Sequence, residues 1–374
     1  MLRECCAAPC AGPTWPAGRR GAAGVRRRGS LLSGLPGSVS GYSRTGRPVV
    51  TDGTDAVAAD VWILDRPDGT DRTDTPWETA ALSAELTERG LRVEAVDWAG
   101  LTPSCVPAGV LREDGRLQVP RLAVVCSRVL TRHPLGHLAD ELAWLGLLAD
   151  AGTRLVNPVG SLGAYDNKVR QIAALASAGL PVPATRVART PQDVDACLGA
   201  WRDVVVKPPY GHASVDVLRL RAAGSDSPHA GGLGTRPGIL VWHLLERHRA
   251  LCVQRFVPNP GRDLRVVVIG SRVAACYFHV NTAPDGNTHH PLYPHGWAAA
   301  ELPPRVEKLV LRATATLGLD IASVDLLEGP DGPVIIEVNP SISRWRSLEG
   351  TEHDRSPRGI THAYADLLCG LLCT

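Results

Sequence analysis

Three oxygen-bearing side chains gather around one predicted β-hairpin late in the sequence. Asp325 lies in the apolar stretch Val-Asp-Leu-Leu, and Glu337 and Asn339 lie in Ile-Ile-Glu-Val-Asn. Because side chains alternate along a strand, Glu337 and Asn339 share one face of theirs. A turn at Gly329-Pro330-Asp331-Gly332 would bring Asp325 close to opposite Glu337 on that face. The pattern therefore predicts that two carboxylates and one amide converge.

Such a group of side chains suits a cation. Two carboxylates between valine and isoleucine neighbours are costly to bury unless a positive charge neutralises them. Carboxylate and amide oxygens are hard ligands, the kind that hold Mg²⁺ where it bridges nucleotide phosphates. An exposed polar face on an ordinary hairpin explains the same pattern without any ligand, and the hairpin alone leaves both interpretations open.

Lysines are scarce in this sequence, which makes their positions informative. Of 40 lysine and arginine residues, only Lys168, Lys207 and Lys308 are lysines. Lys207 ends the apolar strand that begins at Asp203, and Lys168 lies early in a predicted helix, where the helix N-terminus favours anions. Each could be an ordinary surface lysine, but the scarcity favours a role for both in holding phosphates.

A predicted strand at Leu251–Val257 leads through a turn into an arginine-containing segment. An apolar strand at the edge of a domain can offer backbone N–H and C=O groups to an adenine ring. Beyond the turn, Asp263 and Arg265 share a strand face, and the planar guanidinium of Arg265 can clamp a carboxylate or a phosphate. A structural ion pair between neighbouring strands is the alternative for this arginine.

Composition and length limit the class of protein. A chain of 374 residues suggests two or three domains at roughly 150 residues each. No apolar run reaches the ~18 residues of a membrane-spanning helix, and a net charge of +2 argues against a protein built to neutralise nucleic-acid phosphates. The ten cysteines include no C-x-x-C pair, and several lie in apolar runs, which indicates buried thiols in a reducing, cytoplasmic compartment. Nucleic-acid and membrane partners are not expected, and homo-oligomerisation is left open.

The sequence divides into three parts. Residues 1–55 are rich in arginine, glycine and proline and are interpreted as a disordered or non-native leader, with organelle targeting as the alternative. Residues 56–156 alternate short strands with helices and predict a parallel α/β domain. Residues 157–374 predict an α+β domain with mostly antiparallel strands, in lobes of about 157–250 and 251–374.

Four local predictions concern the second domain. A single helix is expected from about residue 162 to 178, closed by the glycine at 179. Irregular loops are expected over 222–238 and 281–297, and the hairpin at 323–339 is expected to be the last ordered element.

The order of these features resembles the ATP-grasp superfamily, most closely the RimK-like α-L-glutamate ligases. The resemblance covers about 155–345 and rests on five ordered blocks, of which no single one is specific. The blocks lie at 165–185, 204–208, 253–257, 261–270 and 323–341. The fold that this resemblance implies is an α/β N-terminal (pre-ATP-grasp) domain followed by a two-lobed α+β ATP-grasp domain.

The resemblance also implies roles for individual residues. The residues that match phosphate contacts are Lys168 and Lys207, and those in the strand that lines adenine are Gln254 and Val257. The residues that match ligands of magnesium, with two ions and Mn²⁺ as an alternative metal, are Asp325, Glu337 and Asn339. Arg265 matches an arginine near the acyl phosphate and the acceptor, so Arg265 and Lys207 are the implied catalytic residues.

The implied activity is amide formation driven by ATP. Enzymes of this family phosphorylate a carboxylate, and an amine then attacks the acyl phosphate. The amine would be an amino acid such as glutamate, and the acceptor a carboxylate-bearing small molecule, peptide or protein tail. Ligation of another amine or a thiol and a nucleotide-binding regulatory role are the alternatives. The regulatory role is favoured by two departures from the family pattern, a glycine-poor loop at 208–214 and no arginine at 281–297, where the candidate substitutes are His289, His290 and His295.

Overall fold

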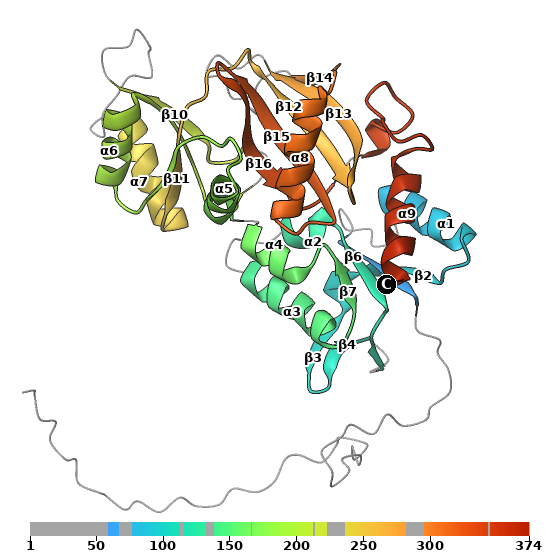
Figure 1. The fold of residues 1–374 in the computed structure, drawn as a ribbon. Helices are drawn as coiled ribbons and strands as arrows, with labels where there is room; N and C mark the ends of the chain where they lie inside the picture. The colour runs from blue at the N-terminus through green and yellow to red at the C-terminus, as the bar shows by residue number, and fades with distance from the viewer. Residues whose placement is uncertain are drawn as a thin grey trace, which may run out of the picture. The chain divides into compact units, whose positions relative to one another are not determined.

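The fold was analysed in a computed structural model (Figure 1). The residues that the structure describes are 59–66, 77–112, 116–131, 138–165, 167–211, 214–222, 236–281, 295–342 and 345–373. The predicted leader over 1–55, His289, His290 and the side chain of His295 lie outside these residues.

The first domain is built on a parallel four-stranded sheet. Its strands are β1 (Val61–Asp65), β2 (Val93–Asp97), β6 (Leu122–Val125) and β7 (Arg154–Val156), in the order β2-β1-β6-β7. The accompanying helices are α1 (Trp77–Glu88), α2 (Ser127–Thr131), α3 (Leu138–Asp150) and α4 (Val159–Tyr165). A small antiparallel sheet is formed by β3 (Thr102–Cys105), β4 (Ala108–Leu111) and β5 (Leu117–Gln118). Apolar side chains line both faces of the parallel sheet, as expected for strands covered on both sides.

A second, antiparallel sheet has one apolar face and one face with polar side chains. Its strands are β8 (Thr185–Ala188), β9 (Asp203–Lys207), β10 (Leu218–Arg221) and β11 (Leu251–Arg255), in the order β10-β9-β11-β8. The helices α6 (Pro191–Trp201) and α7 (Arg236–His248) cover the face that carries Val204, Val206 and Val253. Since neighbours in a strand point to opposite faces, Lys207 and Gln254 lie on the other face.

The third, central sheet carries the predicted hairpin. Its strands are β12 (Arg262–Ile269), β13 (Arg272–Asn281), β14 (His295–Ala299), β15 (Ile321–Gly329) and β16 (Gly332–Asn339), in the antiparallel order β14-β13-β12-β15-β16. One face is apolar except at its end, where Arg262 pairs with Glu328, and it packs under α8 (Pro304–Thr316) (Figure 1). The opposite face is apolar where β12 ends at Val267 and Ile269, but polar where it begins at Asp263 and Arg265. The half of this face around Asp263 and Arg265 can therefore form a polar binding site.

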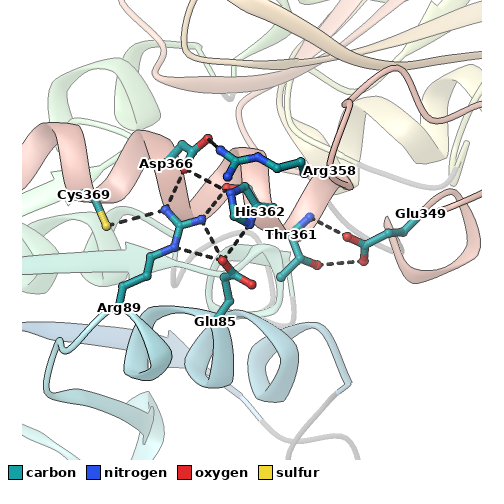
Figure 2. A network of polar contacts seen from close by, with 8 residues as sticks. All are labelled: Glu85, Arg89, Glu349, Arg358, Thr361, His362, Asp366 and Cys369. Atoms are coloured by element: carbon teal, nitrogen blue, oxygen red, sulfur yellow. Dashed lines mark hydrogen bonds and ion pairs between the residues drawn. The ribbon is translucent and has the colours of Figure 1, made fainter.

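The last helix, α9 (Ile360–Leu372), connects the two domains. It packs against α1 and against β12 and β13, and a single apolar core contains residues of the parallel sheet, the central sheet and α9. Polar contacts at its surface join Arg89, which directly follows α1, to Asp366 and to the carbonyl of His362 (Figure 2). A short 3₁₀ helix at Trp345–Ser347 precedes α9. The prediction that the hairpin is the last ordered element is therefore wrong.

Three further local predictions need correction. The expected helix over 162–178 is two helices, α4 and α5 (Lys168–Ser177), because the Asn167 side chain accepts hydrogen bonds from the backbone N–H groups of Val169 and Arg170 and so starts a new helix. The expected loop over 222–238 gives way to α7 at Arg236, and the expected loop over 281–297 gives way to β14 at His295. Residues of α7 pack in the core of the second sheet, and β14 pairs with β13.

Candidate active site

The hairpin brings the three predicted oxygen ligands together. Asp325 of β15 lies directly opposite Glu337 of β16, and Ser323 lies opposite Asn339. The Asn339 side-chain nitrogen is 3.2 Å from an Asp325 carboxylate oxygen. Asp325 is buried, whereas Glu337 keeps a quarter of its side chain exposed. Two carboxylates and an amide thus share one face of the sheet, as alternation along the strands predicts.

Lys168 links this hairpin to the loop that follows β9. Its ammonium group lies 2.7 Å from a Glu337 carboxylate oxygen and donates a hydrogen bond of 2.6 Å to the carbonyl of Gly211. Its backbone N–H donates to the carbonyl of Pro209. Lys168 is the first residue of α5, and the dipole of this helix favours an anion near its N-terminus. A cation therefore lies where a phosphate would approach the Glu337 carboxylate.

Gln171 is a positioning residue that the sequence interpretation missed. Its side-chain amide donates to the carbonyl of Val338 and accepts from the backbone N–H of Val338, with the latter bond 2.7 Å long. Because β16 is the edge strand, this amide pairs with the strand where no neighbouring strand does. The only signal in the sequence is its spacing of three from Lys168, which places both on one helix face.

Lys207 ends β9 opposite Cys252, and its side chain is buried. Burial lowers the pKa of Lys207 from its ordinary value, although Glu337 and Asp325 attract the charged form. Within the described ranges, no hydrogen bond or ion pair to the Lys207 ammonium group is found. The second sheet thus presents a buried cation that a bound anion would stabilise.

The two residues expected near adenine lie on or just after β11, the strand that pairs with the strand of Lys207. Gln254 is buried on the same sheet face, and its side-chain nitrogen is 3.2 Å from the hydroxyl of Thr185. Val257 lies two residues beyond the end of β11, in the connection to the central sheet, and its carbonyl accepts a hydrogen bond from the side chain of Asn259. Gln254 and Val257 stay predictions as adenine contacts.

Arg265 pairs with a predicted metal ligand. It lies opposite Asp325 in the register of β12 and β15, and its guanidinium donates two hydrogen bonds of 2.6 and 2.7 Å to the two carboxylate oxygens. Burial alone would lower the pKa of Arg265, but the Asp325 charge outweighs it and keeps the pKa above its ordinary value. The ion pair between neighbouring strands, the alternative for this arginine, is present.

The charges of the site sum to an excess of one positive charge. Two carboxylates, Asp325 and Glu337, face Lys168, Lys207 and Arg265, and burial raises the pKa of Glu337 less than the two lysines lower it. No group of three histidine, cysteine, aspartate or glutamate side chains that could hold a metal occurs in the described part of the chain. Two carboxylates and an amide can coordinate a metal ion. The three nearby cations favour an ion that binds together with anionic phosphate oxygens.

The same stretch of chain matches a known family. The family model for the RimK-like ATP-grasp domain matches residues 165–354, which is 190 of the 374 residues. The chain belongs to the RimK-like ATP-grasp family. The matched residues include Lys168, Lys207, Arg265 and the whole hairpin. The family predicted from ordered sequence blocks is thereby confirmed.

Curated relatives of this family are named as glutamate ligases. A probable alpha-L-glutamate ligase of Citrobacter koseri is 31% identical over 192 residues, which cover 50% of this chain and 58% of that protein. A tetrahydromethanopterin:alpha-L-glutamate ligase of Methanococcus maripaludis is 30% identical over 201 residues, which cover 52% of this chain and 63% of that protein. The chain thus spans about three-fifths of the length of these relatives.

Solved structures agree on the fold. The D-cycloserine synthetase DcsG superposes with a TM-score of 0.59 at 22% identity, over 83% of this chain and 99% of that one. The ATP-grasp ligase PsnB, complexed with a minimal precursor, gives a TM-score of 0.59 at 20% identity, over 84% of this chain and 99% of that one. The predicted fold class, an α/β N-terminal domain before an α+β ATP-grasp domain, is confirmed. Among the described helices, none has the length and apolar character needed to cross a bilayer.

Proposed function

We propose that this chain is an ADP-forming ATP-grasp ligase that joins a carboxylate to an amine through an acyl phosphate. The observation that carries the proposal is the contact between Lys168 and Glu337, which connects the cation at the start of α5 to the carboxylates of the hairpin. The match to the RimK-like family over the same residues supports the reaction type.

Each charged residue of the site has a role in this reaction. Lys168 and Lys207 hold the ATP phosphates, and Gln254 and Val257 lie along the adenine. Asp325, Glu337 and Asn339 would hold Mg²⁺, as two ions, with Mn²⁺ as an alternative. When bound, Mg²⁺ neutralises charge on the phosphate oxygens.

The chemistry requires no nucleophile from the protein. A carboxylate oxygen attacks the γ-phosphorus and ADP leaves. The amine nitrogen then attacks the acyl carbon, so that an amide forms and phosphate leaves. Arg265 and Lys207 would stabilise the negative charge that develops at the transferred phosphate. Precise placement and charge neutralisation account for the acceleration.

The names of the relatives bear on which amine and which carboxylate the enzyme would join. Names of the relatives favour glutamate as the amine, with a small molecule, peptide or protein tail as the carboxylate acceptor. Ligation of another amine or a thiol is the second candidate, and a nucleotide-binding regulatory protein is the third. The complete set of charged residues at the site favours catalysis over regulation. The unpaired thiols of the described cysteines support action in a reducing, cytoplasmic compartment.

A calorimetric titration with MgATP tests the nucleotide site. Glu337→Gln should weaken MgATP binding about tenfold or more, because it removes one ligand charge from the metal and the partner of Lys168. Glu328→Gln is a matched control, since Glu328 lies in the same hairpin but at its exposed end, paired with Arg262. Equal affinity in all three proteins would contradict the site.

Release of ADP distinguishes the candidate functions. ADP formation that depends on L-glutamate and a carboxylate supports the ligase, and formation that depends on a thiol such as cysteine supports the second candidate. Binding of MgATP without ADP release, across amino-acid and carboxylate panels, would support the regulatory role.

A further inference from the structure

A buried histidine and a buried aspartate lie beside the proposed site, and none of the roles proposed above involves them. Asp263 of β12 and His279 of β13 are directly opposite each other, and His279 Nδ1 is 3.3 Å from an Asp263 carboxylate oxygen. Asp263 is fully buried and His279 is 7% exposed. Both residues lie in the central sheet and come from outside the hairpin.

This pair lies on the same sheet face as the ion pair of Arg265 and Asp325. Asp263 is two residues before Arg265 on β12, and His279 is two residues after Tyr277, which lies opposite Arg265 on β13. Residues two apart on a strand are about 7 Å apart and point to the same side. The pair therefore lies one row along the sheet from Arg265.

Aromatic rings extend this row to the edge of the sheet. Trp297 of β14 lies opposite His279, and the ring centroid of Tyr277 is 4.9 Å from that of His279 and 5.1 Å from that of Trp297. Trp297 is 37% exposed, so the row runs from the solvent edge to the buried pair. Aromatic faces beside a buried carboxylate attract an organic cation such as an ammonium group.

Packing alone does not call for these polar residues. The next positions on the same face, Val267 and Ile269, are apolar and buried, and so are Leu264, Val266 and Val268 on the opposite face of the same strand. Apolar residues in place of a buried charged pair are often neutral or stabilising. The polar pair occurs only at the end of the face that carries the site, which favours a functional reason for it.

The reaction has a step that needs such a pair. An amine reaches the enzyme largely as an ammonium ion and cannot attack until it has lost a proton. We propose that His279 is the base that accepts this proton, and that Asp263 is the positioning residue that orients its imidazole. With Nδ1–H donating to Asp263, the accepting atom is Nε2. This inference rests on the proposed ligase function.

The proton balance of the step is simple. The ammonium ion gives one proton to His279, and the neutral amine nitrogen forms a bond to the acyl carbon. The bond from that carbon to the phosphate oxygen breaks, and phosphate leaves with the electron pair. The second amine proton passes to the leaving phosphate as the amide forms, and His279 returns its own proton to solvent.

The charged and titratable groups near the pair, among the described residues, include Tyr277, Arg265 and His353. Tyr277 borders His279 on its own strand, and burial raises the pKa of Tyr277 to about 12, so its hydroxyl stays protonated. Arg265 follows Asp263 along β12 and stays charged. The ring centroid of His353 is 5.8 Å from that of Tyr277, and it is His279 that contacts Asp263.

Two nucleophiles separate this role from a structural one. With ATP and L-glutamate supplied as both carboxylate and amine, wild type is assayed for amide and, in parallel reactions, for the hydroxamate formed with hydroxylamine. Hydroxylamine is a weak base that is mostly unprotonated at neutral pH, so its attack needs no proton acceptor. The variants are His279→Gln and Asp263→Asn, and His243→Gln on the exposed face of α7 is the control.

The expected result is selective. His279→Gln should slow amide formation about 100-fold while hydroxamate formation stays within a few-fold of wild type. Asp263→Asn should reduce amide formation less and alter its pH profile on the acid side, and His243→Gln should match wild type. Equal losses of amide and hydroxamate in His279→Gln, or no loss of either, would overturn the proposal. Absence of products and of ADP in wild type across the amino-acid and carboxylate panels would instead overturn the ligase function.

Discussion

At the scale of single residues, the burial of one charged side chain in the site opposes folding. Lys207 is buried, and its lowered pKa means that the fold favours its neutral form. The folded protein therefore carries a penalty that is present below the ordinary pKa of lysine and is relieved as the pH rises. A bound phosphate would remove the same penalty.

Replacement of this lysine by an apolar residue should separate stability from function. We expect Lys207→Met to raise the free energy of unfolding of the ligand-free protein by on the order of 1 kcal/mol and to abolish stabilisation by MgATP. Thermal unfolding with and without MgATP measures both effects. The exposed Lys308 provides the control, since Lys308→Met should leave both unchanged. A destabilised Lys207→Met protein that still responds to MgATP would contradict the interpretation.

The sequence predicts best those site residues whose partners lie close to them in the chain. Asp325 and Glu337 belong to one hairpin, so alternation and a turn were enough to bring them together. The partner of Arg265 is Asp325 in a strand that is not adjacent in sequence, and that register depends on the whole sheet. The dyad of Asp263 and His279 lies in the hairpin of β12 and β13, but an irregularity between Val267 and Val268 shifts the register by one residue, so counting from the turn does not place the two residues opposite each other.

At the scale of elements, α5 sets the position of the hairpin relative to the phosphate cations. Lys168 and Gln171 lie on one face of this helix, and they contact the neighbouring residues Glu337 and Val338 of β16. Both side chains are buried. One turn of α5 therefore holds the Lys168 ammonium beside the Glu337 carboxylate, because Gln171 binds the backbone of the next residue, Val338, in the edge strand β16.

Loss of the Gln171 amide should affect stability and nucleotide affinity together. We expect Gln171→Leu to lower the free energy of unfolding by about 2 kcal/mol, because the N–H and C=O groups of Val338 lose their partners. The KM for ATP should rise, since Glu337 is no longer held beside Lys168. Urea unfolding and initial rates of ADP release measure the two effects. Gln192→Leu, at an exposed position of α6, should change stability by less than about 0.5 kcal/mol.

The errors in predicted elements have a common cause. The break between α4 and α5 was missed because the apolar spacing continues past Asn167, although asparagine is a preferred N-cap. The predicted loops overlap the first residues of the helix α7 and of the strand β14 because each element begins at the end of a glycine- and proline-rich stretch.

At the scale of the whole molecule, the last helix joins what the sequence suggests are separate domains. Buried residues of α9 such as Tyr364 and Leu368 lie in one core with Val61 of β1 and Val267 of β12. Asn157 adds a polar link, because its side chain bonds the backbone of Ile321 and the carbonyl of Pro340. The central sheet is thereby tied to the N-terminal domain at the strand that leads to Asp325.

The polar contacts between α1 and α9 make part of this link dependent on pH. Asp366 accepts a hydrogen bond of 2.7 Å from Arg89, which also contacts Glu85 of α1 (Figure 2). Burial raises the pKa of Asp366 less than Arg89 lowers it, so the pKa lies below the ordinary 3.8. A carboxylate with a lowered pKa stabilises the fold above its ordinary pKa, and this contribution is lost as the pH falls through the lowered value.

A double-mutant cycle with Arg89→Met and Asp366→Asn measures this contribution directly. Because Asp366 is half exposed, solvent screens the pair, and we expect a coupling free energy of about 0.5 kcal/mol at neutral pH. The coupling should shrink as the pH falls below 3.8 and should also weaken at high salt. Chemical unfolding of the four proteins across this pH range gives the values. A coupling that stays constant from neutral to acid pH would mean that the Asp366 charge does not hold α9 to α1, and that the shared apolar core alone joins them.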